Sequence, residues 1–211
     1  MEQSAVAHVP VSLATYQLLV DRCAREKLNL VIANGSALHA RILIDKLFEV
    51  ARSNVSLISG VLRQQNKDGV QIYSHDNVIA RAKKFLASPQ STLDVVLQKG
   101  SLDGGSENKF FNEIVNDPTR RGTVSIYYPK EGVLSAHETP HFMVSDRSAY
   151  RFETGKDADP TNESVTAIAN FGDLATAGML SEIFDDVVSL LTADANMRDV
   201  SVFAPGKSFS A

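Results

Sequence analysis

The chain has 211 residues, of which 44% are hydrophobic and 22% are charged, a balance typical of a single globular domain. A net charge of −4 argues against indiscriminate binding of polyanions by the whole surface. A single cysteine, Cys23, excludes an intramolecular disulfide and fits a reducing compartment. The N-terminus lacks the pattern of a secretory signal, and no apolar run approaches the roughly 20 residues of a membrane span. We therefore expect a cytoplasmic protein.

In the first two thirds of the chain, apolar periodicity predicts helices and strands in alternation. Ser12, Ser36 and Asp76 begin three amphipathic stretches, where a side-chain oxygen can cap a helix, and Pro118 ends a fourth. Short branched apolar runs between them have the length and composition of buried strands. The expected elements are helix 12–27, strand 28–33, helix 37–52, strand 54–62, helix 76–88, strand 92–99, helix 108–117 and strand 123–128.

The last third is richer in strands. Two runs on either side of Arg147 and Ser148 predict a hairpin, and Asp173 stands where it can cap a long amphipathic helix. The small, polar tail leaves two alternatives open, a loose segment or an added edge strand. The expected elements are strands 141–146, 149–154 and 164–171, helix 173–192 and, in the tail 193–211, the alternative strand 200–203.

This order predicts an α/β fold with a parallel or mixed sheet and helices on both faces. We divide the chain into a helical extension at 1–27, a domain at 28–192 and a tail at 193–211.

Candidate site residues gather in and just after the predicted hairpin. His141, Asp146 and Glu153 are the candidate catalytic residues, because an imidazole oriented by carboxylates can act as a nucleophile or an acid. Glu153 could pair with His141 or with Arg151. We expect no metal: His137 and His141 have a spacing that suits zinc on a helix, but Pro140 between them argues against a helix. The candidate binding residues are His137, Arg151, Asn162 and Glu163.

The hairpin has a strand, then Asp146, a turn and a second strand, and it is followed by a strand and a helix with Phe184 near its end. This pattern resembles the phospholipase D superfamily, and a similar stretch occurs in bacterial proteins of unknown function. Each half of a superfamily member carries His, one residue, Lys, four residues and Asp. With Asp146 in the Asp position, Thr139 stands for the His and His141 for the Lys. The resemblance therefore implies a degenerate, single-motif branch.

The resemblance implies a phospholipase D-like domain at 28–192 that needs no cofactor, with Asn162 and Glu163 near the family's Asn-x-Glu element. In the family one His attacks phosphorus, Lys neutralises phosphate oxygens and a second His protonates the leaving group. Because this chain has one motif, a complete site implies a homodimer.

Three functions stay open. The first is a non-catalytic or weakly active protein that binds a phosphodiester ligand, such as nucleic acid, lipid or nucleotide, or a partner protein. The second is a metal-independent phosphodiesterase or nuclease with a rearranged site, in which His141 acts, Asp146 and Glu153 orient it, and a second copy completes the site. The third is a plain interaction subunit. A small basic face at Arg81, Lys83 and Lys84 is expected to be solvated, with nucleic-acid contact as the alternative.

Overall fold

The computed structural model describes residues 12–60, 62, 69–98, 108–134, 139–153, 167–193 and 197–209, without the side chains of 198 and 199. Its helices are α1 (Leu13–Glu26), α2 (Ala37–Val50), α3 (Asp76–Leu86), α5 (Lys109–Val115) and α6 (Leu174–Thr192). Its strands are β1 (Ile32–Asn34), β2 (Asn54–Ser59), β3 (Thr92–Leu97), β4 (Thr123–Pro129), β5 (Phe142–Ser145), β6 (Ala149–Glu153), β7 (Ala167–Asn170) and β8 (Met197–Phe203).

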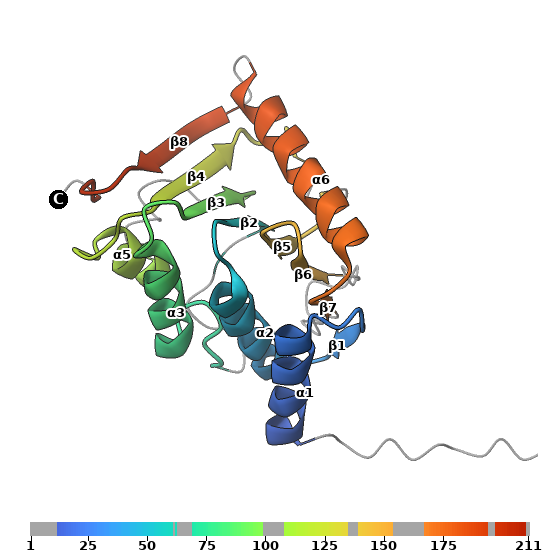
Figure 1. Cartoon of the computed structure of the whole chain (residues 1–211). Coiled ribbons are helices and arrows are strands. Elements are labelled where there is room, and N and C mark those ends of the chain that lie inside the picture. Colours follow the sequence, from blue (N-terminus) through green and yellow to red (C-terminus); the bar gives the residue numbers. More distant parts are fainter. Residues whose placement is uncertain are drawn as a thin grey trace, which may run out of the picture.

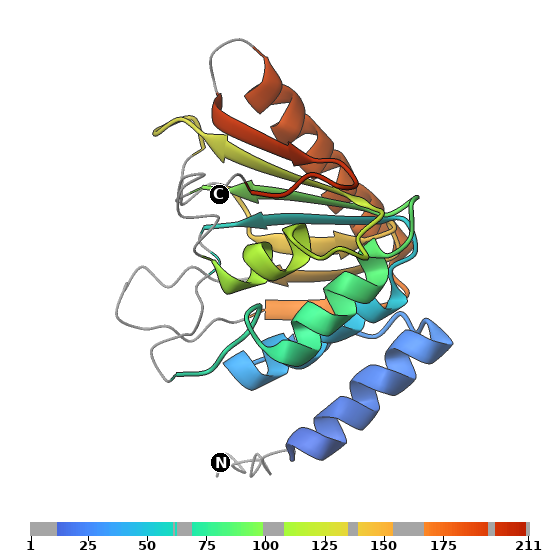
Figure 2. The same cartoon turned by 90° about the vertical axis from the view of Figure 1, so that its left-hand side faces the viewer.

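The strands form one mixed sheet in the order β1-β7-β6-β5-β2-β3-β4-β8. Strands β2, β3 and β4 run parallel, and the remaining neighbours pair antiparallel. Helices α1, α2, α3 and α5 cover one face and α6 crosses the other (Figure 1, Figure 2). The expected α/β fold, a mixed sheet with helices on both faces, is confirmed.

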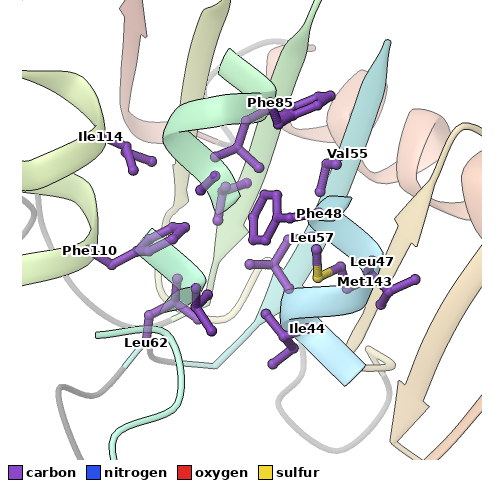
Figure 3. Close-up of a cluster of buried hydrophobic side chains, with 14 of the residues drawn as sticks. Ile44, Leu47, Phe48, Val55, Leu57, Leu62, Phe85, Phe110, Ile114 and Met143 are labelled. Atoms are coloured by element: carbon purple, nitrogen blue, oxygen red, sulfur yellow. The ribbon is translucent and has the colours of Figure 1, made fainter. Parts of the chain in front are cut away.

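Two apolar layers hold the helices against the sheet. The larger lies under α1, α2, α3 and α5, where Phe48, Phe85 and Phe110 pack over Leu57 of β2 and Met143 of β5 (Figure 3). The smaller lies between the sheet and α6, and its buried residues are Ile58, Val96, Phe142, Val144, Tyr150, Ala177, Leu180, Phe184 and Leu191. Alternate residues of β2 and β5 therefore face opposite layers, as the twofold period of a strand requires.

Side-chain caps fix most helix starts. Ser12, Ser36 and Asp173 accept hydrogen bonds from backbone N–H groups in the first turns of α1, α2 and α6, as expected. The expected cap of α3 is wrong: His75 caps this helix, with its Nδ1 accepting from the Asn77 N–H at 3.2 Å. Asp76 is instead the first helical residue, where its negative charge suits the helix N-terminus.

The first predicted strand is shorter than expected. Of residues 28–33, only the last two lie in β1, and Leu30 and Val31 are exposed. A Cβ on Gly172 would stand 2.2 Å from the Lys27 carbonyl oxygen and 2.7 Å from the Asn29 nitrogen. The chain entering β1 thus passes directly against the segment that leaves β7, instead of extending the sheet.

Both ends of the described chain join the same body. Tyr16, Val20 and Cys23 of α1 belong to the larger apolar layer. In the tail, β8 pairs with β4, so of the two alternatives the edge strand is correct. The buried guanidinium of Arg120 donates to five backbone carbonyls, and two of them, those of Ala204 and Lys207, lie beyond the end of the sheet pairing.

None of the helices in the described ranges combines the length and the apolar character that a membrane-spanning segment needs.

Candidate functional site

The β5–β6 hairpin positions the candidate residues. Ser148 donates its N–H to the Ser145 carbonyl at 2.9 Å, which closes a turn whose central residues, Asp146 and Arg147, have φ of 50° and 53°. Two positive φ values fit a type I′ turn, whose twist matches that of the flanking strands. The register that follows pairs Phe142 with Phe152.

His141 and Glu153 lie directly opposite each other at the open end of this hairpin. The Glu153 N–H donates to the His141 carbonyl at 3.0 Å, and the two side chains meet with Nδ1 and Oε2 3.0 Å apart. Both side chains are about one-fifth exposed. They lie on the face of the sheet that carries α1, α2 and α3, because Met143 and Ala149, two and four residues away along their strands, pack in the larger layer. The expected pairing of Glu153 with His141 is observed.

Arg151 joins the same face two residues before Glu153. Its NH1 donates to Glu153 Oε1 at 3.0 Å, so one carboxylate contacts both the guanidinium of Arg151 and the ring of His141. Burial raises the pKa of Glu153, but the hydrogen bond from His141 and the charge of Arg151 outweigh it and hold the pKa below its ordinary value. Glu153 is therefore ionised at neutral pH, and its carboxylate can accept a hydrogen bond from the Nδ1–H of His141.

Gln98 and Gly60 complete the surroundings of the imidazole, and the sequence did not single out either one. They follow β3 and β2 directly, at the carboxyl ends of parallel strands, where ligand sites of open α/β sheets lie. Gln98 Oε1 is 3.1 Å from His141 Nε2. A Cβ on Gly60 would stand 3.2 Å from His141 Cε1, so the missing side chain gives the ring its place.

The contacts of the His141 ring limit which hydrogen bonds its two nitrogens can make. Both nitrogens of His141 face oxygen atoms, which an imidazolium satisfies by donating from each. A neutral ring keeps both contacts only if the Gln98 amide turns over and donates to Nε2. Either way the ring is held at both nitrogens, and a ligand must displace Gln98 to reach Nε2.

Asp146 is not part of this cluster, and the expectation that it orients His141 is wrong. It follows β5 while His141 precedes it, so their Cα atoms are about 16 Å apart along the strand. Its carboxylate accepts the N–H groups of Arg52, Ser53 and Asn54 and the Ser53 hydroxyl, at 2.6–2.9 Å. Asp146 therefore fastens the hairpin turn to the start of β2.

The other candidates divide into two groups. His137, Asn162 and Glu163 lie outside the described residues. The basic face is largely neutralised: Arg81 contacts Asp45 and Glu49, and Lys83 pairs with Glu113 at 2.6 Å. In the ranges that the structure describes, no three His, Cys, Asp or Glu side chains gather in a way that could hold a metal ion.

Comparison with known proteins gives matches in structure only. No protein-family model matches the sequence. No curated protein matches it either. TrmBL2, an archaeal chromatin protein with a novel mode of DNA binding, matches at a TM-score of 0.50 and 11% identity, over 83% of this chain and 60% of TrmBL2.

Two further solved structures match equally well. Nuc, a phospholipase D family member from Salmonella typhimurium, has a TM-score of 0.50 and 15% identity over 81% of this chain and 97% of Nuc. Polyphosphate kinase from Porphyromonas gingivalis has a TM-score of 0.50 and 11% identity over 90% of this chain, which spans only 26% of the kinase. Identities this low bear on the fold alone. The chain therefore has a phospholipase D-like fold, a mixed α/β sheet with helices on both faces.

Proposed function

We propose that this chain is a phospholipase D-like domain with a degenerate motif, which binds a phosphodiester-containing ligand with little or no turnover and acts as a homodimer. The observation that supports the ligand site is the cluster of His141, Arg151 and Glu153 at the carboxyl ends of β2 and β3. It combines a partly exposed imidazole and carboxylate, His141 and Glu153, with the buried guanidinium of Arg151.

Degeneracy follows from the residues at the motif positions. In the register that aligns Asp146, the position of the attacking imidazole holds Thr139, a buried residue whose hydroxyl is a weaker nucleophile than an imidazole. The position of the motif Lys holds His141. Loss of one charge-stabilising donor alone costs on the order of 3 kcal/mol of transition-state stabilisation. Binding survives such losses more readily than turnover, because it does not need the developing charge to be neutralised.

A binding experiment tests this proposal. The probe is a short single-stranded oligonucleotide with abasic tetrahydrofuran units, which presents phosphodiesters without bases, titrated at two salt concentrations into the native protein and His141→Gln. Lys207→Gln is the control, since Lys207 is exposed and follows β8 beside the start of β4, at the opposite end of the sheet from the cluster. We expect the native protein and the control to bind equally, and His141→Gln to bind about tenfold more weakly. Equal binding by all three proteins overturns the proposal.

A working phosphodiesterase is the second candidate, and the His141–Glu153 hydrogen bond favours it. An ionised carboxylate on Nδ1 holds the ring in one tautomer and raises the reactivity of Nε2, which is how an imidazole nucleophile or acid is prepared. Turnover of bis(4-nitrophenyl) phosphate by the native protein that disappears in both His141→Gln and Glu153→Gln supports this candidate. Absence of turnover in the native protein removes it and leaves binding.

Homodimerisation is part of both candidates, because one chain carries one motif. Sedimentation equilibrium on the full chain is expected to give twice the monomer mass. A monomer that still binds the abasic oligonucleotide retains the ligand site but removes the shared, two-copy arrangement.

A further inference from the structure

Asn34, the last residue of β1, has a buried side chain. It is 2% exposed, and neither Oδ1 nor Nδ2 has a hydrogen-bond partner among the residues that the structure describes. Buried amides almost always have partners, because a donor or acceptor without one keeps the full cost of leaving water. An orphaned amide at a strand end is therefore suited to bind a group that the described residues do not supply.

The sheet register places Asn34 in the same row as the candidate site. Asn34 pairs with Ala167 of β7, Ala167 pairs with Glu153 of β6, and Glu153 lies opposite His141. Directly paired residues point to the same face of a sheet, so the Asn34 amide shares a face with the His141–Glu153 pair. With strands about 4.8 Å apart, Asn34 and Glu153 have Cα atoms about 10 Å apart.

A second orphaned donor lies in the adjacent row of the sheet. Arg151 is 5% exposed, and its Nε has no hydrogen-bond partner among the described residues, although its NH1 is bound to Glu153. Arg151 pairs with Ala169, and Ala167 stands beside Glu153. On this face, the strand between Asn34 and the carboxylate therefore contributes only the methyl side chains of alanines. Gly35 follows Asn34, and a Cβ added to Gly35 would have no neighbouring atom within 4 Å.

We propose that Asn34 and Arg151 form a base-binding subsite next to the phosphodiester site, so that the ligand is a nucleotide or single-stranded nucleic acid, read through the edge of an adenine. A carboxamide offers one donor and one acceptor side by side, which complements the N7 acceptor and N6 amino donor of adenine. Arg151 Nε supplies one further donor. This inference rests on the proposed function, since the phosphate is bound by the His141 cluster.

Other phosphodiesters match the subsite less well. The headgroup cation of a choline lipid offers no hydrogen-bond donor to Asn34 Oδ1, and a glycerol chain presents no rigid donor–acceptor pair. A base and its phosphate are separated by a sugar ring, so one nucleotide can contact two sites whose Cα atoms are about 10 Å apart.

The test varies both the ligand and the protein. The ligands are a single-stranded oligodeoxyadenylate, the same length with 7-deazaadenine, which lacks the N7 acceptor, and the abasic oligonucleotide. The proteins are the native chain and Asn34→Leu, whose branched side chain has the same number of non-hydrogen atoms and no polar group. The matched control is Asn170→Leu: Asn170 is also buried, but its amide donates to Asn29 and accepts from Gly172 and Asp173.

We expect the native protein to bind oligodeoxyadenylate about tenfold more tightly than the 7-deaza and abasic forms. Asn34→Leu should bind all three alike, at the abasic level, with a melting temperature equal to or above the native value, because it removes two unpaired polar atoms. Asn170→Leu should melt at a lower temperature. If Asn34→Leu fails to fold, the 7-deaza comparison on the native protein decides by itself.

The outcomes separate this inference from the proposed function. Equal binding of the adenine, 7-deaza and abasic oligonucleotides overturns the base subsite and leaves phosphodiester binding intact. Absence of binding to all three, with His141→Gln indistinguishable from native, overturns both. Binding of free dinucleotide as tightly as of the longer oligonucleotide identifies a nucleotide as the ligand, and tighter binding of the longer form identifies single-stranded nucleic acid.

Discussion

Replacing Asp146 with asparagine tests whether the β5–β6 turn is held by the start of β2. The carboxylate accepts three backbone N–H groups and one hydroxyl. Asparagine tolerates the positive φ of 50° at this position, so the substitution changes the hydrogen bonds without adding backbone strain. It keeps one acceptor oxygen, but turns an N–H₂ donor towards a backbone N–H and removes the charge.

The expected loss is about 2 kcal/mol. Hydrogen bonds to a charged acceptor contribute about 1.5–3 kcal/mol when buried, and these are only partly buried, so about 1 kcal/mol each is the appropriate value. Asparagine loses the bond to Arg52 and weakens the other three. For a chain of this length, 2 kcal/mol lowers the melting temperature by about 4–8 °C.

The measurement is thermal unfolding by circular dichroism at pH 7, with Arg147→Asn as the control. Arg147 lies in the same turn at φ 53°, and its exposed ion pair with Glu182 contributes little. A melting temperature for Asp146→Asn within 1 °C of native contradicts the assigned role. Because Asp146 lies at the far end of β5 from His141, ligand affinity at 20 °C should stay unchanged.

The difference in melting temperature between the native protein and Asp146→Asn should also depend on pH. Burial raises the pKa of Asp146, but the hydrogen bonds from the backbone and from Ser53 lower it by more. The pKa of Asp146 therefore lies below its ordinary value of about 4. A group with a depressed folded pKa stabilises the protein above its unfolded pKa, and the stabilisation is lost as pH falls through the folded pKa. The two melting temperatures should therefore converge below about pH 4 and stay apart between pH 5 and 8.

Three further substitutions follow from the same contacts. Glu153→Gln leaves the buried Arg151 without its carboxylate and should lower the free energy of unfolding in urea by about 2–3 kcal/mol, an effect that fades below about pH 4 because the pKa of Glu153 is depressed. Gly60→Ala brings a methyl group to 3.2 Å from His141 and should weaken binding of the abasic oligonucleotide severalfold with little change in melting temperature; unchanged affinity contradicts a tight ring position. Arg120→Met leaves five carbonyls without a donor and should expose the C-terminal segment to limited proteolysis, whereas native-like resistance argues that β8 pairing alone holds it.

Helix positions could be predicted from the sequence because their signals are local. Ser12, Ser36 and Asp173 each cap a helix through a backbone N–H three residues later, and this spacing is visible in the sequence. The wrong cap at α3 has a local cause too. An imidazole nitrogen can accept a backbone hydrogen bond, as a carboxylate can, and His75 directly precedes Asp76. The first predicted strand is too long, because an apolar run does not reveal that residues 27–29 pass directly against the backbone of Gly172.

The hairpin that carries half of the site could be predicted, but its register could not. A hairpin centred between Arg147 and Ser148 places His141 opposite Thr154, whereas the observed hairpin is centred on Arg147 and places His141 opposite Glu153. The role of Asp146 could not be predicted either, since its partners are 92 to 94 residues away in the sequence. Gln98 and Asn34 were missed for a related reason: a polar residue at the end of an apolar run is indistinguishable from the start of a loop until the strands are ordered.

The two ends of β5 carry different tasks, and this explains which part of the motif pattern is present. At one end Asp146 ties a turn to a distant strand, a role that the fold needs whether or not the protein performs chemistry. At the other end, in the alignment that we propose, Thr139 and His141 take the positions of the attacking imidazole and the Lys, which serve only phosphoryl transfer. A carboxylate, Glu153, then binds the imidazole in the Lys position from the opposite strand. A fold retained with its structural acid, but with new polar contacts at the ligand end, is what we expect of a domain whose specificity comes from binding.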